Sequence, residues 1–206
     1  MIPDTLILTE LTGRSDPLLL PWLDLYETAF PPTERVLVSR ILSALEQIEQ
    51  GRGNGRRLAC STDSAGRLTS LLDTYEPPAL EAGFLWYLAV IPALRGQGLG
   101  ARLYRRAFEQ MRPAVKALFF DVEDPREMKT PQDVECAVRR IAFYRRLGAR
   151  LIGGIRYIQT VGDHQPPITL RLMAHPGAEM SAREAIALAS PILGGAITLE
   201  EEPYWE

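Results

Sequence analysis

The residues with the clearest chemical potential form a glycine-rich stretch, IPALRGQGLG, at positions 91–100. Gly96, Gly98 and Gly100 lack the Cβ atoms that would keep a ligand away from the main chain, so consecutive N–H groups can converge on an anion. Arg95 adds a positive charge beside them. An apolar helical pattern begins directly after the glycines, so the same N–H groups are expected at a helix N-terminus, whose dipole favours negative charge. The stretch therefore predicts a binding site for a pyrophosphate group.

Other glycine-rich motifs fit this stretch less well. A nucleotide P-loop requires Gly-Lys followed by Ser or Thr, whereas Ala101 follows Gly100 here. The dinucleotide fingerprint G-x-G-x-x-A fits Gly96, Gly98 and Ala101, and Asp121 ends a hydrophobic run about 20 residues further on. In that fold the first glycine follows its strand directly, but here IPALR intervenes, with a proline that cannot continue a central ladder. An ordinary strand-turn-helix corner would explain one glycine and not three.

Two motifs in this chain resemble those of the GCN5-related N-acetyltransferases. Arg95-x-x-Gly98-x-Gly100 is similar to the family's Q/R-x-x-G-x-G/A motif for the acyl-CoA pyrophosphate, and the VIP before it is similar to the family's lead-in. Downstream, RRIAFYRRLGA at 139–149 resembles the later helix that carries a tyrosine facing the coenzyme sulfur. The resemblance covers about residues 5–174.

The resemblance implies acetyl-CoA as co-substrate, with no metal ion. The implied coenzyme-binding residues lie on the strand before the glycines and in the motif itself: Leu88, Ala89, Val90, Arg95, Gly96, Gln97, Gly98, Leu99, Gly100 and Ala101. The main chain of residues 88–90 would also donate hydrogen bonds to the oxyanion of the tetrahedral intermediate.

The implied reaction is transfer of an acetyl group to a primary amine by direct attack in a ternary complex. A lysine-like amine has a pKa of about 10.4, so only on the order of one part in a thousand is neutral near pH 7, and a proton acceptor is useful. The departing thiolate needs a proton or a hydrogen bond, which a tyrosine hydroxyl with a pKa of about 10 can supply. Tyr144 occupies the matching position in the later helix and is the expected general acid. The neighbouring Phe143 has no proton to donate and serves as its control.

The proton acceptor has several candidates. Asp121 and Glu123 are two positions apart on an expected strand, so they share one face. Glu123 is the first choice. Asp121, Glu34 in the FPPTER segment and Glu76 at the end of the third expected strand are alternatives. An enzyme that selects the neutral fraction of the amine would need no base.

Composition argues against several other classes of protein. A chain of 206 residues with 46% hydrophobic residues is long enough for one well-buried core, and a net charge of -3 without a basic stripe gives no footprint for nucleic acid. No apolar run approaches the roughly 20 residues that span a bilayer, and MIPDTLILTE lacks a signal-peptide pattern, so we expect a cytoplasmic protein with no membrane partner. Cys60, Cys136, His164 and His175 are too few and too scattered for a disulfide framework or a metal site.

The order of apolar patterns predicts an α/β fold of the α+β type. Its centre is expected to be a mixed, mostly antiparallel sheet of about seven strands, flanked by helices and splayed between the fourth and fifth strands, as the resemblance implies. The expected strands lie near 6–11, 57–62, 68–75, 84–90, 115–122, 151–160 and 168–173. The expected helices lie near 18–30, 38–50, 99–111 and 134–147.

Residues 1–174 are expected to form a single acyl-CoA N-acyltransferase domain. Residues 175–206 contain the helix-like SAREAIALASPIL and the acidic tail EEEPYWE, and we expect them either to pack on the domain or to form a homodimer contact. The acceptor is expected to be a small-molecule or polypeptide amine. Two other functions stay open, a non-catalytic acyl-CoA-binding sensor or assembly module and, third, an NAD-dependent oxidoreductase.

Overall fold

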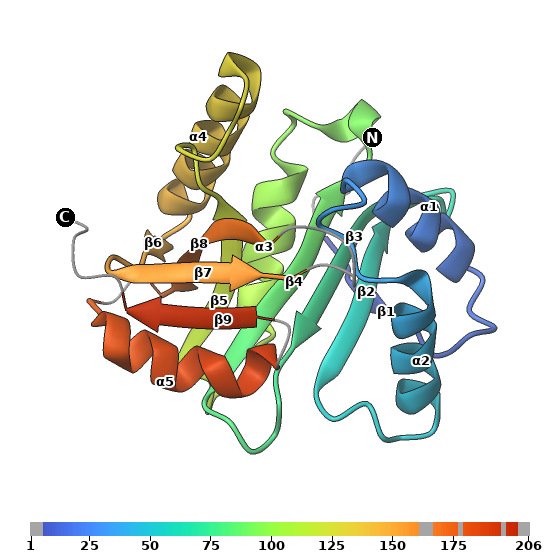
Figure 1. Ribbon diagram of the computed structural model, residues 1–206. Helices are drawn as coiled ribbons and strands as arrows, with labels where there is room; N and C mark the ends of the chain where they lie inside the picture. The colour runs from blue at the N-terminus through green and yellow to red at the C-terminus, as the bar shows by residue number, and fades with distance from the viewer. Residues whose placement is uncertain (1–5, 161–166, 177–178, 195–196, 202–206) are drawn as a thin grey trace. The chain divides into compact units, whose positions relative to one another are not determined.

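The computed structural model describes residues 6–160, 167–176, 179–194 and 197–201 (Figure 1). The helices are α1 Leu19–Ala29, α2 Val38–Glu49, α3 Leu99–Glu109, α4 Pro131–Arg146 and α5 Ala182–Leu193, and a short 3-10 turn covers Pro92–Leu94. The strands are β1 Thr9–Glu10, β2 Arg56–Thr62, β3 Leu68–Tyr75, β4 Ala82–Val90, β5 Ala117–Glu123, β6 Arg150–Leu151, β7 Ile155–Gln159, β8 Ile168–His175 and β9 Ile197–Glu201.

Hydrogen-bonded neighbours in the sheet follow the order β1-β2-β3-β4-β5-β8-β7-β9, and β6 pairs with β8. β4 and β5 pair in parallel over Ala82–Phe84 and Ala117–Phe119, whereas β5 and β8 are antiparallel. The predicted mixed, mostly antiparallel sheet flanked by helices is therefore confirmed. The sheet has nine strands in the described part of the chain, against about seven expected.

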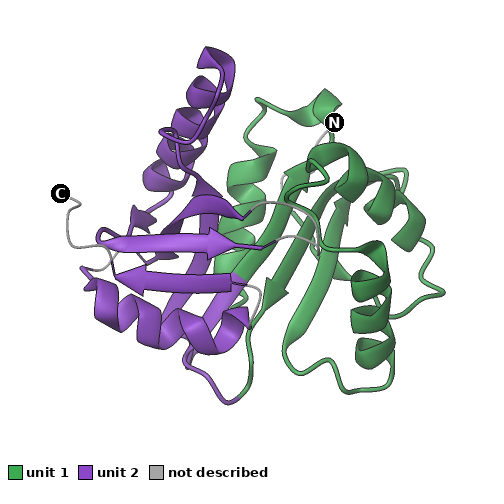
Figure 2. Ribbon diagram, in the orientation of Figure 1, with its two compact units in different colours: residues 1–78, 85–112 green, residues 79–84, 113–206 purple. Residues whose placement is uncertain are grey.

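The chain forms two compact units (Figure 2). Unit 1 consists of residues 1–78 and 85–112, and unit 2 consists of residues 79–84 and 113–206. β4 contributes its first three residues to unit 2 and the rest to unit 1. The single domain over 1–174 stays a prediction.

In unit 1, α1 and α2 pack onto the β2–β3 hairpin through apolar stripes at helical spacing. Trp22 and Tyr26 of α1 and Ile41 and Leu45 of α2 have no exposed surface. The Trp22 Nε1 donates a hydrogen bond to the Ala59 carbonyl at 3.0 Å, so the indole is anchored to β2 at its polar end. These helices and the hairpin lie where the periodicity predicts them.

A buried ion pair crosses the same hairpin. Asp73 of β3 is fully buried, and both of its carboxylate oxygens accept from Arg56 of β2, at 3.1 Å from Nε and 2.7 Å from Nη2. This two-point geometry neutralises the carboxylate inside the sheet. Asp73 is therefore a structural acid.

In unit 2, β5 is buried on both faces, as its continuous hydrophobic run predicts. α4 begins at Thr130, whose hydroxyl accepts from the Asp133 N–H at 3.1 Å, and Pro131 occupies the first turn. Val138 of this helix is 50% exposed, whereas Ala137, Ile141 and Tyr144 are buried. The buried face of α4 therefore follows Ala137, Ile141 and Tyr144 and leaves Val138 at the surface.

The last third of unit 2 departs from the sequence-based expectation. The strand expected near 151–160 is divided into β6 and β7 by a turn in which Gly154 has φ +69°. α5 begins with a reciprocal capping box between Ser181 and Glu184, and β9 then pairs antiparallel with β7. The expected C-terminal helix is thus present, whereas the strand after it was not predicted. The homodimer contact stays a prediction.

Candidate functional site

The glycine-rich stretch forms the connection from β4 to α3 in unit 1. Gly96 has φ +75° and Gly98 has φ +79°, a conformation that L side chains rarely adopt. A Cβ built on either glycine would meet no heavy atom of the described residues within 4 Å. Backbone conformation, and not crowding by the protein, therefore requires glycine at both positions, and open space is left over the loop.

Gly98 is also the N-cap residue of α3, and no side chain of the described residues caps this helix end. The Arg102 N–H donates to the Gly98 carbonyl at 3.1 Å, which begins the helical hydrogen bonding. The N–H groups of the first turn have no partner inside a helix, so an uncapped terminus offers them to an anion together with the positive end of the dipole. Leu99 is buried and anchors the start of the helix. This helix end is the one at which the sequence predicts a pyrophosphate site.

Two side chains brace the loop. The Arg95 Nε donates to the Val90 carbonyl at 3.0 Å, which ties the guanidinium to the end of β4. The Gln97 Nε2 donates to the Ala93 carbonyl at 3.0 Å, across the 3-10 turn. Arg95 is therefore a positive charge held beside the loop by the protein itself.

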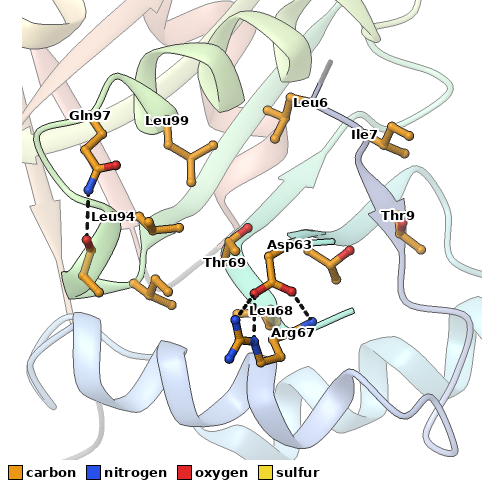
Figure 3. Close-up of a pocket in the computed structure, with 13 residues that line it drawn as sticks. Leu6, Ile7, Thr9, Asp63, Arg67, Leu68, Thr69, Leu94, Gln97 and Leu99 are labelled. Atoms are coloured by element: carbon orange, nitrogen blue, oxygen red, sulfur yellow. Dashed lines mark hydrogen bonds and ion pairs between the residues drawn. The ribbon is translucent and has the colours of Figure 1, made fainter. Parts of the chain in front are cut away.

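A cavity of about 790 Å³ adjoins this loop within unit 1 (Figure 3). Leu68, Leu99 and other apolar side chains line most of it, and Gln97 also borders it. Asp63 and Arg67 of the β2–β3 turn lie at another part of the wall and pair with each other at 2.7 Å. The volume is typical of a small-molecule site. The sequence did not predict this cavity, because it is formed by three separate segments of unit 1.

Unit 2 contains a second group of candidate residues, the Asp121 cluster, made of Asp121, Glu123, Arg140, Tyr144 and Tyr157. Asp121 and Glu123 lie on β5, Arg140 and Tyr144 on α4, and Tyr157 on β7. The Tyr157 hydroxyl donates to the Asp121 Oδ2 at 3.1 Å, and the Arg140 guanidinium forms an ion pair with the Glu123 Oε1. The fold thus brings three sequence-predicted residues, Asp121, Glu123 and Tyr144, into one cluster.

The surroundings of the Asp121 cluster shift two pKa values upward. Burial raises the pKa of Asp121 to about 6; the hydrogen bond from Tyr157 acts in the opposite direction and the charge of Glu123 adds to the rise. Burial also raises the pKa of Tyr144 to about 12, although Arg140 opposes this rise. At neutral pH the tyrosine is therefore protonated and the aspartate is mostly ionised.

The Tyr144 ring and the second oxygen of Glu123 have different surroundings. The Tyr144 ring lies 4.4 Å from the Phe120 ring and 5.0 Å from the Phe143 ring, measured between centroids. The Glu123 Oε2 is buried and has no hydrogen-bond partner among the described residues. A buried carboxylate oxygen usually has a partner, so this atom is suited to accept a hydrogen bond from a ligand.

The other acids considered from sequence lie in unit 1. Glu76 is 3% exposed; its Oε2 accepts from the Arg112 N–H at 3.0 Å and its Oε1 lies 4.0 Å from Arg57 Nη1. The Glu34 carbonyl accepts from the Tyr87 hydroxyl at 3.1 Å. The contacts of Glu76 connect a strand end to the segment after α3, which is a structural role.

The other residues noted in the sequence lie in ordinary structural positions. Leu88, Ala89 and Val90 form the last residues of β4, the second and third of them buried. Cys60 is a buried thiol whose pKa burial raises to about 11, and Cys136 is exposed; both are free. Among the described residues, no three His, Cys, Asp or Glu side chains gather where they could hold a metal ion. His164 lies outside the described residues.

None of the helices in the described ranges has the length and apolarity that are needed to cross a membrane.

Several comparisons place this chain among known proteins. The model of the acetyltransferase (GNAT) family matches residues 22–149. The fold is similar to that of a protein from Bacteroides thetaiotaomicron assigned to the GNAT acetyltransferases, with a TM-score of 0.70 and 19% identity over 88% of this chain and 92% of that one. It is also similar to a Bacillus subtilis acetyltransferase solved in complex with CoA, with a TM-score of 0.54 and 11% identity over 82% and 97% of the two chains.

A further similar structure is the ribosomal-protein-S18-alanine N-acetyltransferase of Escherichia coli, with a TM-score of 0.54 and 21% identity over 85% of this chain and 97% of that one. At these identities the structures show a shared fold. No curated protein matches the sequence.

The family match spans more than half of the chain and includes both the glycine-rich loop and the helix that carries Tyr144. The two left-handed glycines, and the helix end that no side chain of the described residues caps, lie within the matched residues. The chain belongs to the acetyltransferase (GNAT) family.

Proposed function

We propose that this protein is an N-acetyltransferase that moves an acetyl group from acetyl-CoA to a primary amine by direct attack in a ternary complex. The observation that carries the proposal is the N-terminus of α3. Gly96 and Gly98, both with positive φ, lie just before this helix, and no side chain of the described residues caps it. Such a terminus favours a pyrophosphate, and acetyl-CoA contains one. Membership of the GNAT family supports acyl-CoA as the acyl donor.

The proposed coenzyme-binding groups all belong to unit 1. Main-chain N–H groups at the start of α3 would bind the pyrophosphate, and Arg95 would add a charge held in place by Val90. The full proposed set is Leu88, Ala89, Val90, Arg95, Gly96, Gln97, Gly98, Leu99, Gly100 and Ala101. Bound acetyl-CoA supplies an activated acetyl group as a thioester.

Tyr144 is the proposed donor to the departing thiolate. Its hydroxyl is protonated at neutral pH because burial raises its pKa to about 12. Complete proton transfer to a thiolate with a pKa near 8.5 would be uphill by about 3.5 pKa units, or about 5 kcal/mol. A hydrogen bond from Tyr144 that stabilises the thiolate as the C–S bond breaks is therefore the favoured role.

The carboxylates of the Asp121 cluster are the proposed proton acceptor, with Glu123 and Asp121 on one face of β5. The two carboxylates outnumber the single Arg140 cation of the cluster, and the remaining negative charge favours a cationic acceptor, which a protonated amine is at neutral pH. Both a small-molecule amine and a polypeptide amine carry that charge. The main chain of residues 88–90 is the proposed source of oxyanion donors.

The test combines binding with turnover. Thermal unfolding is measured with acetyl-CoA, CoA and NADH, and free thiol is then followed with acetyl-CoA and a panel of polyamines, amino acids, aminoglycosides, lysine peptides and peptide N-termini. We expect stabilisation by acetyl-CoA and CoA but not by NADH, and thiol release that depends on an amine. Stabilisation by NADH alone would contradict the proposal, and acetyl-CoA binding without acetylation of any amine would favour the sensor function instead.

A further inference from the structure

Tyr157 reaches Asp121 across an intervening strand. β8 lies between β5 and β7 in the hydrogen-bond order, with Leu172 opposite Asp121 and Leu170 opposite Tyr157. Tyr157 is fully buried, and its hydroxyl is 3.1 Å from the Asp121 Oδ2. Neighbouring strands are separated by about 4.8 Å, so this contact links side chains on strands roughly 10 Å apart. A buried phenol bonded in this way restricts the direction of the carboxylate.

We propose that Asp121 takes the proton from the acceptor ammonium and that Tyr157 is the positioning residue that holds the Asp121 carboxylate. This inference rests on the proposed acetyltransferase function and specifies which acid of the cluster acts as the base. Asp121 as a whole residue is only partly buried, and the proposal requires that an amine or a bridging water molecule reaches its carboxylate.

The partners of the two acids differ in charge. The Glu123 Oε1 is paired with the Arg140 guanidinium, so the negative charge of Glu123 is already neutralised by a direct ion pair. The hydroxyl that donates to Asp121 is neutral. A carboxylate whose charge is not compensated by a direct ion pair gains more by accepting a proton.

The titratable and charged groups that act on Asp121 lie on β5, α4 and β7. Glu123 lies on the same strand, Arg140 and Tyr144 lie on α4, and Tyr157 lies on β7. β8 places the apolar Leu172 opposite it. With a pKa of about 6, an aspartate is about nine-tenths ionised at pH 7 and is a stronger base than an ordinary aspartate.

The proposed step balances protons and electrons. One N–H bond of the ammonium breaks, its proton passes to the Asp121 carboxylate, and the freed lone pair forms the C–N bond to the thioester carbonyl carbon. When the C–S bond breaks, its electron pair stays on sulfur, and a second proton from the nitrogen balances the thiolate. Asp121 later releases its proton to solvent, so the products are an amide, a thiol and one proton.

The first test is the pH dependence of kcat/KM with an acetylated amine, for the wild type, Asp121→Asn, Tyr157→Phe and Glu123→Gln. We expect the wild-type value to fall below about pH 6, and Asp121→Asn to lose about 10²- to 10⁴-fold in kcat/KM together with this acidic limb. Tyr157→Phe keeps the ring but removes a donor to the charged carboxylate, so the limb should move to higher pH by about one unit. Glu123→Gln removes a charge that raises the pKa of Asp121, so the limb should remain and move to lower pH.

The second test needs no turnover. The carboxyl carbon of Asp121 is titrated by ¹³C NMR in the free wild-type protein and in Tyr157→Phe. An inflection near pH 6 that rises in the variant is the expected result. A pKa of Asp121 near the ordinary value for aspartate, or the same pKa in the wild type and in Tyr157→Phe, would overturn the positioning role.

The outcomes separate the inference from the function on which it rests. Turnover whose acidic limb is removed by Glu123→Gln and kept by Asp121→Asn overturns this inference alone. The same holds for a rate that rises tenfold per pH unit with no inflection near pH 6, because the enzyme would then select the neutral amine. Failure to acetylate any amine overturns the proposed function, and the catalytic role of Asp121 with it.

Discussion

Replacement of Gly98 by alanine tests whether the start of α3 binds the coenzyme, and unit 1 contains a matched control. Gly98 has φ +79° and Gly66, in the β2–β3 turn, has φ +77°. A Cβ at either position meets no heavy atom of the described residues within 4 Å. Gly98→Ala and Gly66→Ala therefore impose nearly the same backbone strain, but only the first changes the proposed pyrophosphate site.

The strain has a predictable cost. An L residue in the left-handed region costs about 1–2 kcal/mol, and the lower entropy of the unfolded alanine chain offsets about 0.4–1 kcal/mol of it. Each variant should therefore lose about 1 kcal/mol of stability. For a chain of this length that corresponds to a fall in Tm of about 2–4 °C without ligand.

The ligand-dependent gain distinguishes the two variants. Acetyl-CoA at 100 times its Kd should stabilise the wild type by about 2.7 kcal/mol, which is a rise in Tm of about 5–10 °C. A tenfold weaker affinity in Gly98→Ala would reduce this gain to about 1.4 kcal/mol, roughly half. Gly66→Ala should keep the full gain.

Differential scanning fluorimetry over a series of acetyl-CoA concentrations measures both the Tm without ligand and the ligand-dependent rise in Tm. Equal ligand-dependent gains in the two variants would show that the α3 N-terminus does not bind the coenzyme. A loss of the gain in Gly66→Ala would show that strain in unit 1, and not the loop, controls binding.

Three other predictions concern unit 2. Tyr144→Phe should lower kcat by about 10²-fold or more with an unchanged Kd for acetyl-CoA, whereas Phe143→Leu should lower Tm and keep kcat; equal losses of kcat would contradict the role of Tyr144. Ser181→Ala removes the capping box of α5 and should cost about 1 kcal/mol in urea unfolding, largely recovered by Ser181→Thr; no difference between the two variants would contradict a capping role. The folded-state pKa of Asp121 lies above its unfolded value, so the wild type loses the stabilising contribution of the protonated Asp121 as pH rises from 4 to about 6. Asp121→Asn has no such loss and should become more stable relative to the wild type over that range. A difference in Tm between the two proteins that moves the opposite way between pH 4 and 8 would refute the raised pKa.

Local patterns predicted most of unit 1. The β2–β3 hairpin, α1, α2 and the connection from β4 to α3 follow from apolar periodicity and turn residues close together in the sequence. The left-handed conformation at Gly96 and Gly98 also follows locally, since glycine is the residue that adopts it readily. The pyrophosphate site could therefore be proposed before the fold was known, and it stays a prediction.

Tertiary pairing decided what the sequence did not reveal. β9 is a short acidic strand, ITLEE, whose hydrogen bonding depends on finding β7. The alternation in IRYIQ places Ile155 and Tyr157 on one buried face, but it does not indicate that β8 separates β7 from β5. The contact between Tyr157 and Asp121 depends on that strand order, so no local signal could have predicted it.

Two aspartates on strands show why the Asp121 cluster is the stronger candidate for chemistry. Burial raises the pKa of Asp73 as well, but Asp73 has no exposed surface and both of its carboxylate oxygens accept from Arg56, so it is a structural residue. Asp121 accepts from the neutral Tyr157 hydroxyl, and burial raises its pKa to about 6. Its ionised form predominates at neutral pH but is less favourable in the fold than in the unfolded chain, and an asparagine would avoid that cost. Acids held in this way cluster at functional sites, because a raised pKa brings their proton affinity close to the working pH.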